Sequence, residues 1–311
     1  MRVCSVCECV RSFNNVLPCQ PPPKRADFQF KNPNSNLLNR PKYQIFQAIY
    51  AWLKGDEIRV IGHLADFNSC DPQSFINLTD KDQIFCSAYS HFLGKLIDTP
   101  LLKEATVASH QVLYHLGESH CLSYAHKRIK INGADYTVSP RITFGGKAYH
   151  FSTEKENSFK AITKVNFDSL PNGSKVFVSF GEIDCRPNEG FISAATKNNK
   201  SIEEYIDNTV IGYLAWFSKQ NQNKNHDLFF LNVPAPNYDE RYTVDVNKKV
   251  KSTIKLFNSL LSKTVLDYNL NLIDVYKFTV GHDEFSNGSF HIDKRHLSSF
   301  AIPEIEKQIY I

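Results

Sequence analysis

The segment HQVLYHLGESH, residues 110–120, joins an apolar run of strand length to a short turn that contains a serine. Three later runs have the same near-continuous apolar character, namely KVFVSFG (175–181), DLFFLNVPAP (227–236) and LNLIDVYKF (270–278). Such runs are typical of strands that are buried on both faces. DYTVSPRITF (135–144) is a further candidate strand.

Long helical patterns separate these strands. Apolar residues recur at three- and four-residue spacing over 201–220 and 241–269, which predicts an amphipathic helix in each segment. Strands that alternate with helices form parallel sheets covered by helices on both faces. The sequence therefore predicts an α/β fold, a three-layer sandwich around a parallel, flavodoxin-like sheet.

The N-terminal third has a different character. YQIFQAIYAWLKGDEIRVIGHLADF (43–67) and DKDQIFCSAYSHFLGKLI (80–97) have helical periodicity, whereas the stretch before them is rich in Pro and Asn and has none. We expect an irregular, Cys-containing lead-in over 1–41, a small helical subdomain over 42–108 and the α/β domain over 109–311.

Composition narrows the possible partners. Lys and Arg number 36 against 32 for Asp and Glu, and the basic residues are scattered, so we expect no nucleic-acid partner. No apolar run approaches the roughly 20 residues of a membrane span, and MRVCSVCECVRSFNN (1–15) lacks the apolar core of a secretory signal. These features predict a cytoplasmic protein without membrane contact.

Cysteines cluster only at the N-terminus. Cys4, Cys7, Cys9 and Cys19 could hold a zinc ion, but three of the four are crowded together, whereas a structural zinc site usually pairs two separated knuckles. A cysteine-containing tail without metal is the interpretation we adopt, and we expect no metal or cofactor.

Polar residues follow the predicted strands at the edge where open parallel sheets bind their ligands. Ser119 follows the first strand, and the segment SFHIDKRHLSSF (289–300), after the last, places Asp293 and His296 three residues apart. A histidine beside a carboxylate is held in one tautomer and can accept a serine proton. Ser119, His296 and Asp293 are thus candidates for nucleophile, base and orienting acid.

These loops resemble the conserved blocks of the SGNH (GDSL-like) hydrolase superfamily over about residues 110–305. LGESHCLS resembles its first block, with Glu118 where Asp is usual, and HIDKRHLS resembles its last, D-x-x-H. FGGKAYHF and VSFGEIDCR stand where the second and third blocks belong. The resemblance implies acyl transfer through Ser119, with a backbone N–H of Gly145 or Gly146 in the oxyanion hole.

The third block, GEIDCR, departs from the family pattern G-x-N-D. Ile183 replaces the Asn that donates to the oxyanion, so His120 or Arg186 would have to substitute, or activity would be low. Asp184 ends the block and is a candidate pocket residue. With the helical N-terminal region, this variant looks like the branch of the superfamily associated with bacterial surface polysaccharides, which implies an esterase or O-acyltransferase acting on acetylated sugars.

Other interpretations remain open at this stage. Ser119 could instead cap a helix, Cys121 could be a nucleophile, and His291 with Asp293 and His296 could bind a metal ion. The domain could also be a non-catalytic module that binds a glycan or a protein, and the helical region could contact a protein partner.

Overall fold

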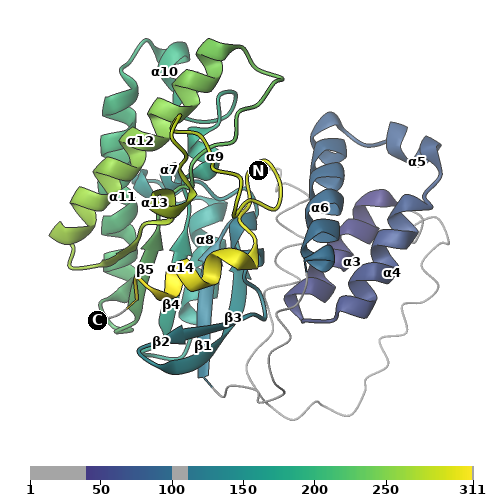
Figure 1. Ribbon diagram of the computed structural model, residues 1–311, viewed down its shortest axis with the longest axis horizontal. Helices are drawn as coiled ribbons and strands as arrows, with labels where there is room; N and C mark the ends of the chain where they lie inside the picture. The colour runs from purple at the N-terminus through teal and green to yellow at the C-terminus, as the bar shows by residue number, and fades with distance from the viewer. Residues whose placement is uncertain (1–39, 100–110, 310–311) are drawn as a thin grey trace. The chain divides into compact units, whose positions relative to one another are not determined.

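A computed structural model describes residues 40–99 and 111–309 of the chain (Figure 1). The chain divides into two compact units, Met1–Ala105 and Thr106–Ile311. The cluster Cys4, Cys7, Cys9 and Cys19 lies outside the described residues, so the zinc alternative for it stays untested.

The first unit is helical, and its helix starts follow from local capping. The side chains of Asp56, Asp71 and Thr79 each accept a hydrogen bond from the first turn of the helix that follows them. Apolar residues of three helices form its core, including Ile45, Trp52 and Leu93. The helices are α3 (Pro41–Leu53), α4 (Glu57–Asn68), α5 (Pro72–Ile76) and α6 (Asp80–Asp98).

The second unit contains a six-stranded sheet with the order β2-β3-β1-β4-β5-β6. Five strands are parallel, and only β2 runs antiparallel to its neighbour β3. The predicted α/β fold class is confirmed. The strands are β1 (Gln111–Gly117), β2 (Arg128–Ile131), β3 (Ala134–Ile142), β4 (Lys175–Ser179), β5 (Asp227–Leu231) and β6 (Asn271–Ile273).

Strand β2 is an element that the sequence analysis did not predict. It is joined to β3 by Asn132 and Gly133, which both have positive φ, 50° and 79°. A two-residue Asn-Gly connection is the usual type I′ hairpin turn, so the signal was present but only four residues long on the β2 side. The predicted strand 270–278 was too long, because Asp274 caps a short helix directly after β6.

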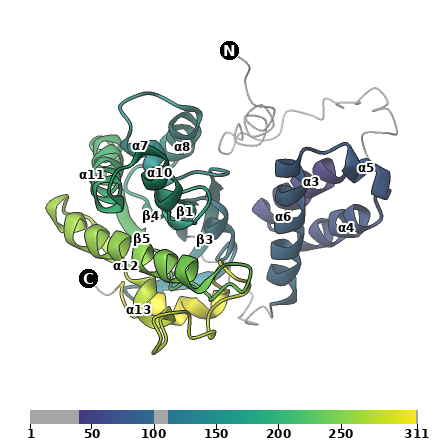
Figure 2. The same ribbon diagram turned by 90° about the horizontal axis from the view of Figure 1, so that it is seen from above.

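Alternating strand residues divide the core into two layers, one on each face of the sheet. Val176 and Val178 of β4 pack with the helices on one face, whereas Phe177 between them faces the other. The first face carries α7 (Ala148–Ser152), α8 (Ser158–Asp168), α11 (Ile202–Asn221) and α12 (Val244–Asp267), and α14 (Ile302–Glu306) packs on the second (Figures 1 and 2).

Short elements complete the second unit: η1 (Ser119–Leu122), α9 (Glu182–Cys185), α10 (Phe191–Asn198), α13 (Val275–Thr279) and η2 (Ser299–Ala301). Helices α11 and α12 correspond to the two predicted amphipathic helices. No helix within the described ranges combines the length and the apolar character that crossing a bilayer requires.

Candidate active site

Ser119 lies at the carboxyl end of β1, in the first turn of η1. Gly117 ends the strand opposite Ser179 of β4, where a side chain would have no room: a Cβ atom there would lie 2.3 Å from the Ser179 Oγ. The Glu118 side chain caps η1 by accepting from the His120 N–H. The strand end thus fixes where the serine hydroxyl is presented.

The three residues that the sequence analysis selected meet in one hydrogen-bonded chain. The Ser119 Oγ lies 2.8 Å from the His296 Nε2, and the His296 Nδ1 lies 2.7 Å from the Asp293 Oδ2. Residues 177 positions apart in sequence are therefore in direct contact. The side chains of His296 and Asp293 are only 12% and 13% exposed, so the chain is largely shielded from water.

The loop that carries Asp293 and His296 is held by its own backbone. The Asp293 Oδ1 accepts from the N–H groups of Arg295 and His296, both at 2.7 Å, and the Ile292 N–H donates to the His296 carbonyl. Burial alone would raise the pKa of Asp293, but the hydrogen bond and charge of His296 outweigh it and hold that pKa well below its usual range. Asp293 is therefore a carboxylate that orients the imidazole.

Asn237, which follows β5, hydrogen-bonds to the backbone of this loop. Its side-chain Nδ2 donates to the carbonyls of Asp293 (3.4 Å) and Lys294 (3.1 Å). The sequence analysis missed Asn237, although this residue directly follows the predicted strand run DLFFLNVPAP (227–236).

His120 and Glu118 form a buried pair beside the chain. The His120 Nδ1 contacts the Glu118 Oε1, and the His120 Nε2 lies 3.1 Å from the Arg295 carbonyl oxygen. The rings of His120 and His296 are 4.7 Å apart. Glu118 also accepts a hydrogen bond from the Ser119 hydroxyl, at 2.6 Å. Glu118 was noted in the sequence only as a replacement for Asp.

Two loops carry the backbone N–H groups that the sequence analysis suggested as oxyanion donors. Within the described residues, the N–H groups of Ser119 and Gly145 have no hydrogen-bond acceptor, whereas the Gly146 N–H donates to the Thr143 carbonyl in a tight turn. Of the two glycines considered, Gly145 is the one with a free donor. Ile183 is buried, 6% exposed, and its side chain offers no donor.

Arg186, a suggested substitute for the missing Asn, is already engaged. Its Nε and Nη2 bond the Glu182 carboxylate and its Nη1 bonds Glu189, at 2.6–3.1 Å. His120 is likewise committed through both ring nitrogens. These contacts hold the Arg186 guanidinium between two carboxylates and use three of its five N–H donors, whereas both ring nitrogens of His120 are used.

The Asp184 carboxylate binds backbone N–H groups and does not face an open pocket. It is 1% exposed, and its two carboxylate oxygens accept from the N–H groups of Ala148 and Tyr149 at the start of α7. Burial raises the pKa of Asp184 to about 7, although the two N–H donors oppose that shift. Asp184 thereby ties the loop after β4 to the loop after β3.

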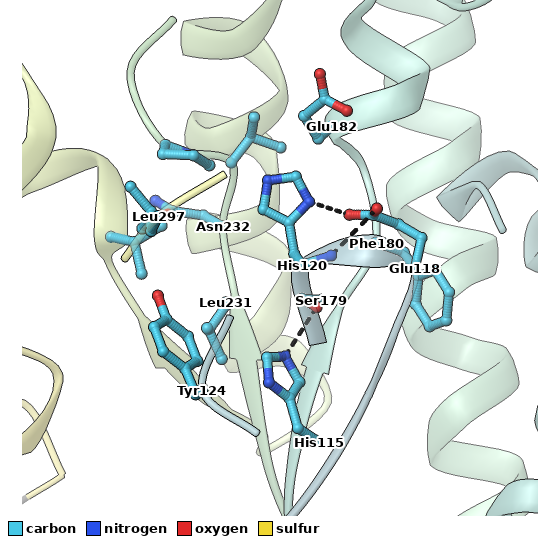
Figure 3. Close-up of a pocket in the computed structure, with 13 residues that line it drawn as sticks. His115, Glu118, His120, Tyr124, Ser179, Phe180, Glu182, Leu231, Asn232 and Leu297 are labelled. Atoms are coloured by element: carbon cyan, nitrogen blue, oxygen red, sulfur yellow. Dashed lines mark hydrogen bonds and ion pairs between the residues drawn. The ribbon is translucent and has the colours of Figure 1, made fainter. Parts of the chain in front are cut away.

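Two small cavities are lined by chain neighbours of Ser119, Asp293 and His296, which form the candidate triad, although none of these three residues lines either cavity. One, of about 30 Å³, is lined by Glu118 and His120 and, on the strand side, by His115 and Ser179, which are hydrogen-bonded to each other (Figure 3). The second, of about 70 Å³, is lined in part by Val, Pro and Ala residues at 233–236. Polar and charged residues also line it: Glu182, Arg186, Asn237, Asp239, Tyr242, Asn247, His291, Lys294 and Arg295.

The hydrogen bonds of Glu118, His120 and His296 argue against a metal ion bound between them. The ligand atoms of Glu118, His120 and His296 lie within 4.8 Å of one another, the one such grouping among the described residues. Both ring nitrogens of His120 already face oxygen acceptors, and the His296 Nε2 faces Ser119. The groups share protons, so we assign no metal ligands. His291 instead bonds the Ser286 hydroxyl.

Cys121 is fully buried, and burial raises the pKa of its thiol well above the usual value. A thiol that resists ionisation is a poor nucleophile. The alternative with Cys121 as nucleophile is therefore disfavoured on physical grounds.

Comparisons with known proteins find similarity only among solved structures. No family model matches the chain, and no curated protein is similar to it. A protein described as an acylhydrolase from Bacteroides fragilis has 15% identity and a TM-score of 0.43, with 68% of this chain and 89% of that one covered.

Two further structures are similar at the same level. The extracellular lipase of Streptomyces rimosus has 12% identity and a TM-score of 0.41, with 64% of this chain and 99% of that one covered. The lipase/acylhydrolase of Enterococcus faecalis has 14% identity and a TM-score of 0.39, with 64% and 93% covered. Similarity this low carries no weight for activity, and the function proposed below rests on the site.

Proposed function

We propose that the chain is a serine-dependent acyl-transfer enzyme of the SGNH (GDSL-like) type, acting on an esterified, O-acetylated carbohydrate. The observation that carries the proposal is the hydrogen-bonded chain from Ser119 through His296 to Asp293 at the carboxyl edge of a parallel sheet. A nucleophile, a base and an orienting acid in contact are the minimum for acyl transfer through a serine.

The reaction follows from these contacts. The Ser119 Oγ attacks the ester carbonyl while the His296 Nε2 takes the hydroxyl proton, and Asp293 stabilises the resulting imidazolium. The free N–H groups of Ser119 and Gly145 stabilise the oxyanion of the tetrahedral intermediate. The C–O bond then breaks, His296 passes its proton to the leaving alcohol, and the acyl group remains on Ser119.

The acceptor of the acyl group decides between two activities. Water releases a carboxylic acid and makes the protein an esterase, whereas a sugar hydroxyl makes it an O-acyltransferase. The cavity of about 70 Å³, which Lys294 and Arg295 of the His296 loop help to line, supports a short acyl group and a polar alcohol, because it is small and is lined in part by charged and amide side chains.

The test uses a serine-directed fluorophosphonate probe and hydrolysis of p-nitrophenyl acetate. We expect both signals to be lost in Ser119→Ala and labelling to be strongly reduced in His296→Ala. Ser123→Ala is the matched control, because Ser123 lies four residues away, is buried, and its hydroxyl has no partner among the described residues. Hydrolysis by Ser119→Ala at the wild-type rate would refute the assignment.

A second candidate function rests on Ile183, which removes an oxyanion donor that is typically worth about 3 kcal/mol of transition-state stabilisation. A non-catalytic module that binds a glycan through the same cavity fits that loss. Absence of probe labelling, together with intact folding and glycan binding that Ser119→Ala leaves unchanged, would favour this module.

A further inference from the structure

The Ser119 hydroxyl faces two acceptors. Its Oγ lies 2.6 Å from the Glu118 Oε2 and 2.8 Å from the His296 Nε2. A serine hydroxyl has a single proton, so it donates to one of these groups at a time. The acceptor that holds the proton decides whether the serine is ready to be deprotonated by His296.

Glu118 is held in its ionised form by His120. The His120 ring has an oxygen acceptor at each nitrogen, the Glu118 carboxylate and the Arg295 carbonyl, which fits an imidazolium that donates twice. Burial alone would lower the pKa of His120, but the charge and hydrogen bond of Glu118 outweigh it and raise that pKa to about 9. Burial likewise opposes ionisation of Glu118, yet His120 lowers the pKa of Glu118 to about 2.

A charged Glu118 requires two hydrogen-bond states of the site. When the Ser119 hydroxyl donates to Glu118, the His296 Nε2 must be protonated and donate to the Ser119 Oγ, because two lone pairs at 2.8 Å would repel. When His296 is neutral, the hydroxyl turns to the His296 Nε2 and the serine can be activated.

We propose that Glu118 is a positioning residue: it accepts the Ser119 hydroxyl while His296 is protonated and releases it when His296 loses that proton. This inference rests on the proposed serine-dependent function. The Glu118 carboxylate stabilises the imidazole whenever it carries a second proton, as it does during attack by Ser119, and His120 supports that stabilisation by keeping the carboxylate ionised.

Few other charges face this cluster. His115 and His291 are neutral near pH 7, because burial lowers their pKa values to about 3 and about 4. The titratable groups that face Glu118, His120 and His296 are His115 on β1, Cys121 on η1, Glu182 on α9, and His291 and Asp293 on the loop that carries His296.

The experiment compares pH profiles of kcat/KM for p-nitrophenyl acetate. In Glu118→Gln the acidic limb is expected to move to lower pH by about one unit, because a neutral amide no longer stabilises the protonated imidazole. The plateau is expected to fall about tenfold, because the same imidazolium forms in the transition state. In His120→Asn the limb is expected to move to lower pH as well, because the buried Glu118 loses the cation that keeps it ionised and so stabilises the protonated imidazole less.

A shift in the same direction from two adjacent variants, only one of which alters Glu118, separates electrostatic positioning from a loss of packing at Glu118, and either variant suffices if the other fails to fold. Glu189→Gln is the control, because Glu189 is a nearby carboxylate that contacts Arg186 and not Ser119. A limb that stays in place in Glu118→Gln, while Ser119→Ala is inactive, would overturn this inference and leave the proposed function intact. Full activity in Ser119→Ala would refute both.

Discussion

Gly117→Ala is expected to destabilise the α/β unit and to disturb the serine that follows. Gly117 is the last residue of β1 and pairs with Ser179 of β4. A Cβ atom at this position would lie 2.3 Å from the Ser179 Oγ and 2.8 Å from the Ser179 carbonyl oxygen, well inside van der Waals contact. Rotation of the Ser179 side chain would relieve the first contact, but only movement of a strand would relieve the second.

The cost has two parts. Overpacking at a buried site costs about 1–3 kcal/mol. Displacing the Ser179 Oγ also breaks its 2.9 Å hydrogen bond to the His115 Nε2, which contributes about 1 kcal/mol. Gly117→Ala should therefore lower the free energy of unfolding by about 2–4 kcal/mol.

The assay is urea unfolding followed by tryptophan fluorescence. The chain has two tryptophans, Trp52 in the helical unit and Trp216 in the α/β unit. A Trp52→Phe background leaves Trp216 as the only reporter, so the transition belongs to the α/β unit. Gly281→Ala is the comparison and should cost less, because its Cβ would meet a backbone oxygen of Phe285 at 3.3 Å, a milder contact than either one at Gly117.

A double variant tests the physical cause. Ser179→Ala removes the closest atom, so it should recover about 1 kcal/mol of the loss in Gly117→Ala and leave the remainder, which the carbonyl oxygen causes. A free energy of unfolding for Gly117→Ala within 0.5 kcal/mol of the parent, or a loss that Ser179→Ala does not reduce, would refute the reasoning.

Three further predictions concern the triad and its support. Asp293→Asn should lower kcat/KM for p-nitrophenyl acetate by about 10³–10⁴, because an amide cannot hold the imidazole in the tautomer that accepts the serine proton; a loss below tenfold would argue against Asp293 as orienting acid. Asn237→Ala should lower kcat about tenfold with little change in KM, because the loop of Asp293 loses its outer brace; equal kcat in the two proteins would show that the brace is dispensable. Burial lowers the pKa of His115 to about 3 in the folded protein, against 6.5 in the unfolded chain, so the unfolded chain takes up this proton first as the pH falls. The free energy of unfolding, measured in urea, should therefore fall by about 3 kcal/mol from this group between pH 6.5 and 4. The fall should be smaller in His115→Gln.

The sequence analysis located the strands because each is a local pattern. The runs at 110–117, 175–181 and 227–236 are strongly apolar, since a strand covered on both faces has little polar surface. Their order along the chain, with helices between, is sufficient for a parallel sheet. Short elements such as β2 were not predicted, because four residues are too few to show a hydrophobic periodicity.

Part of the candidate site was predictable from the order of the strands. Parallel strands present their carboxyl ends at one edge, so Ser119 and the Asp293–His296 segment could be expected to meet there. Their hydrogen bonds agree with that expectation. Asp184 and Arg186 could not be placed in this way, because a carboxylate or a guanidinium in a loop has several partners within reach.

By itself, the sequence determined the α/β class, the helical character of the N-terminal unit and the order of the polar loops, because hydrophobic periodicity and local turn chemistry act over a few residues. Only the tertiary structure decided that Glu118 shares the Ser119 hydroxyl with His296, that His120 is bonded at both ring nitrogens, and that Gly145 rather than Gly146 keeps a free N–H. Hydrogen bonds depend on separations of a few tenths of an ångström between residues that are distant in sequence, and no local pattern encodes those separations.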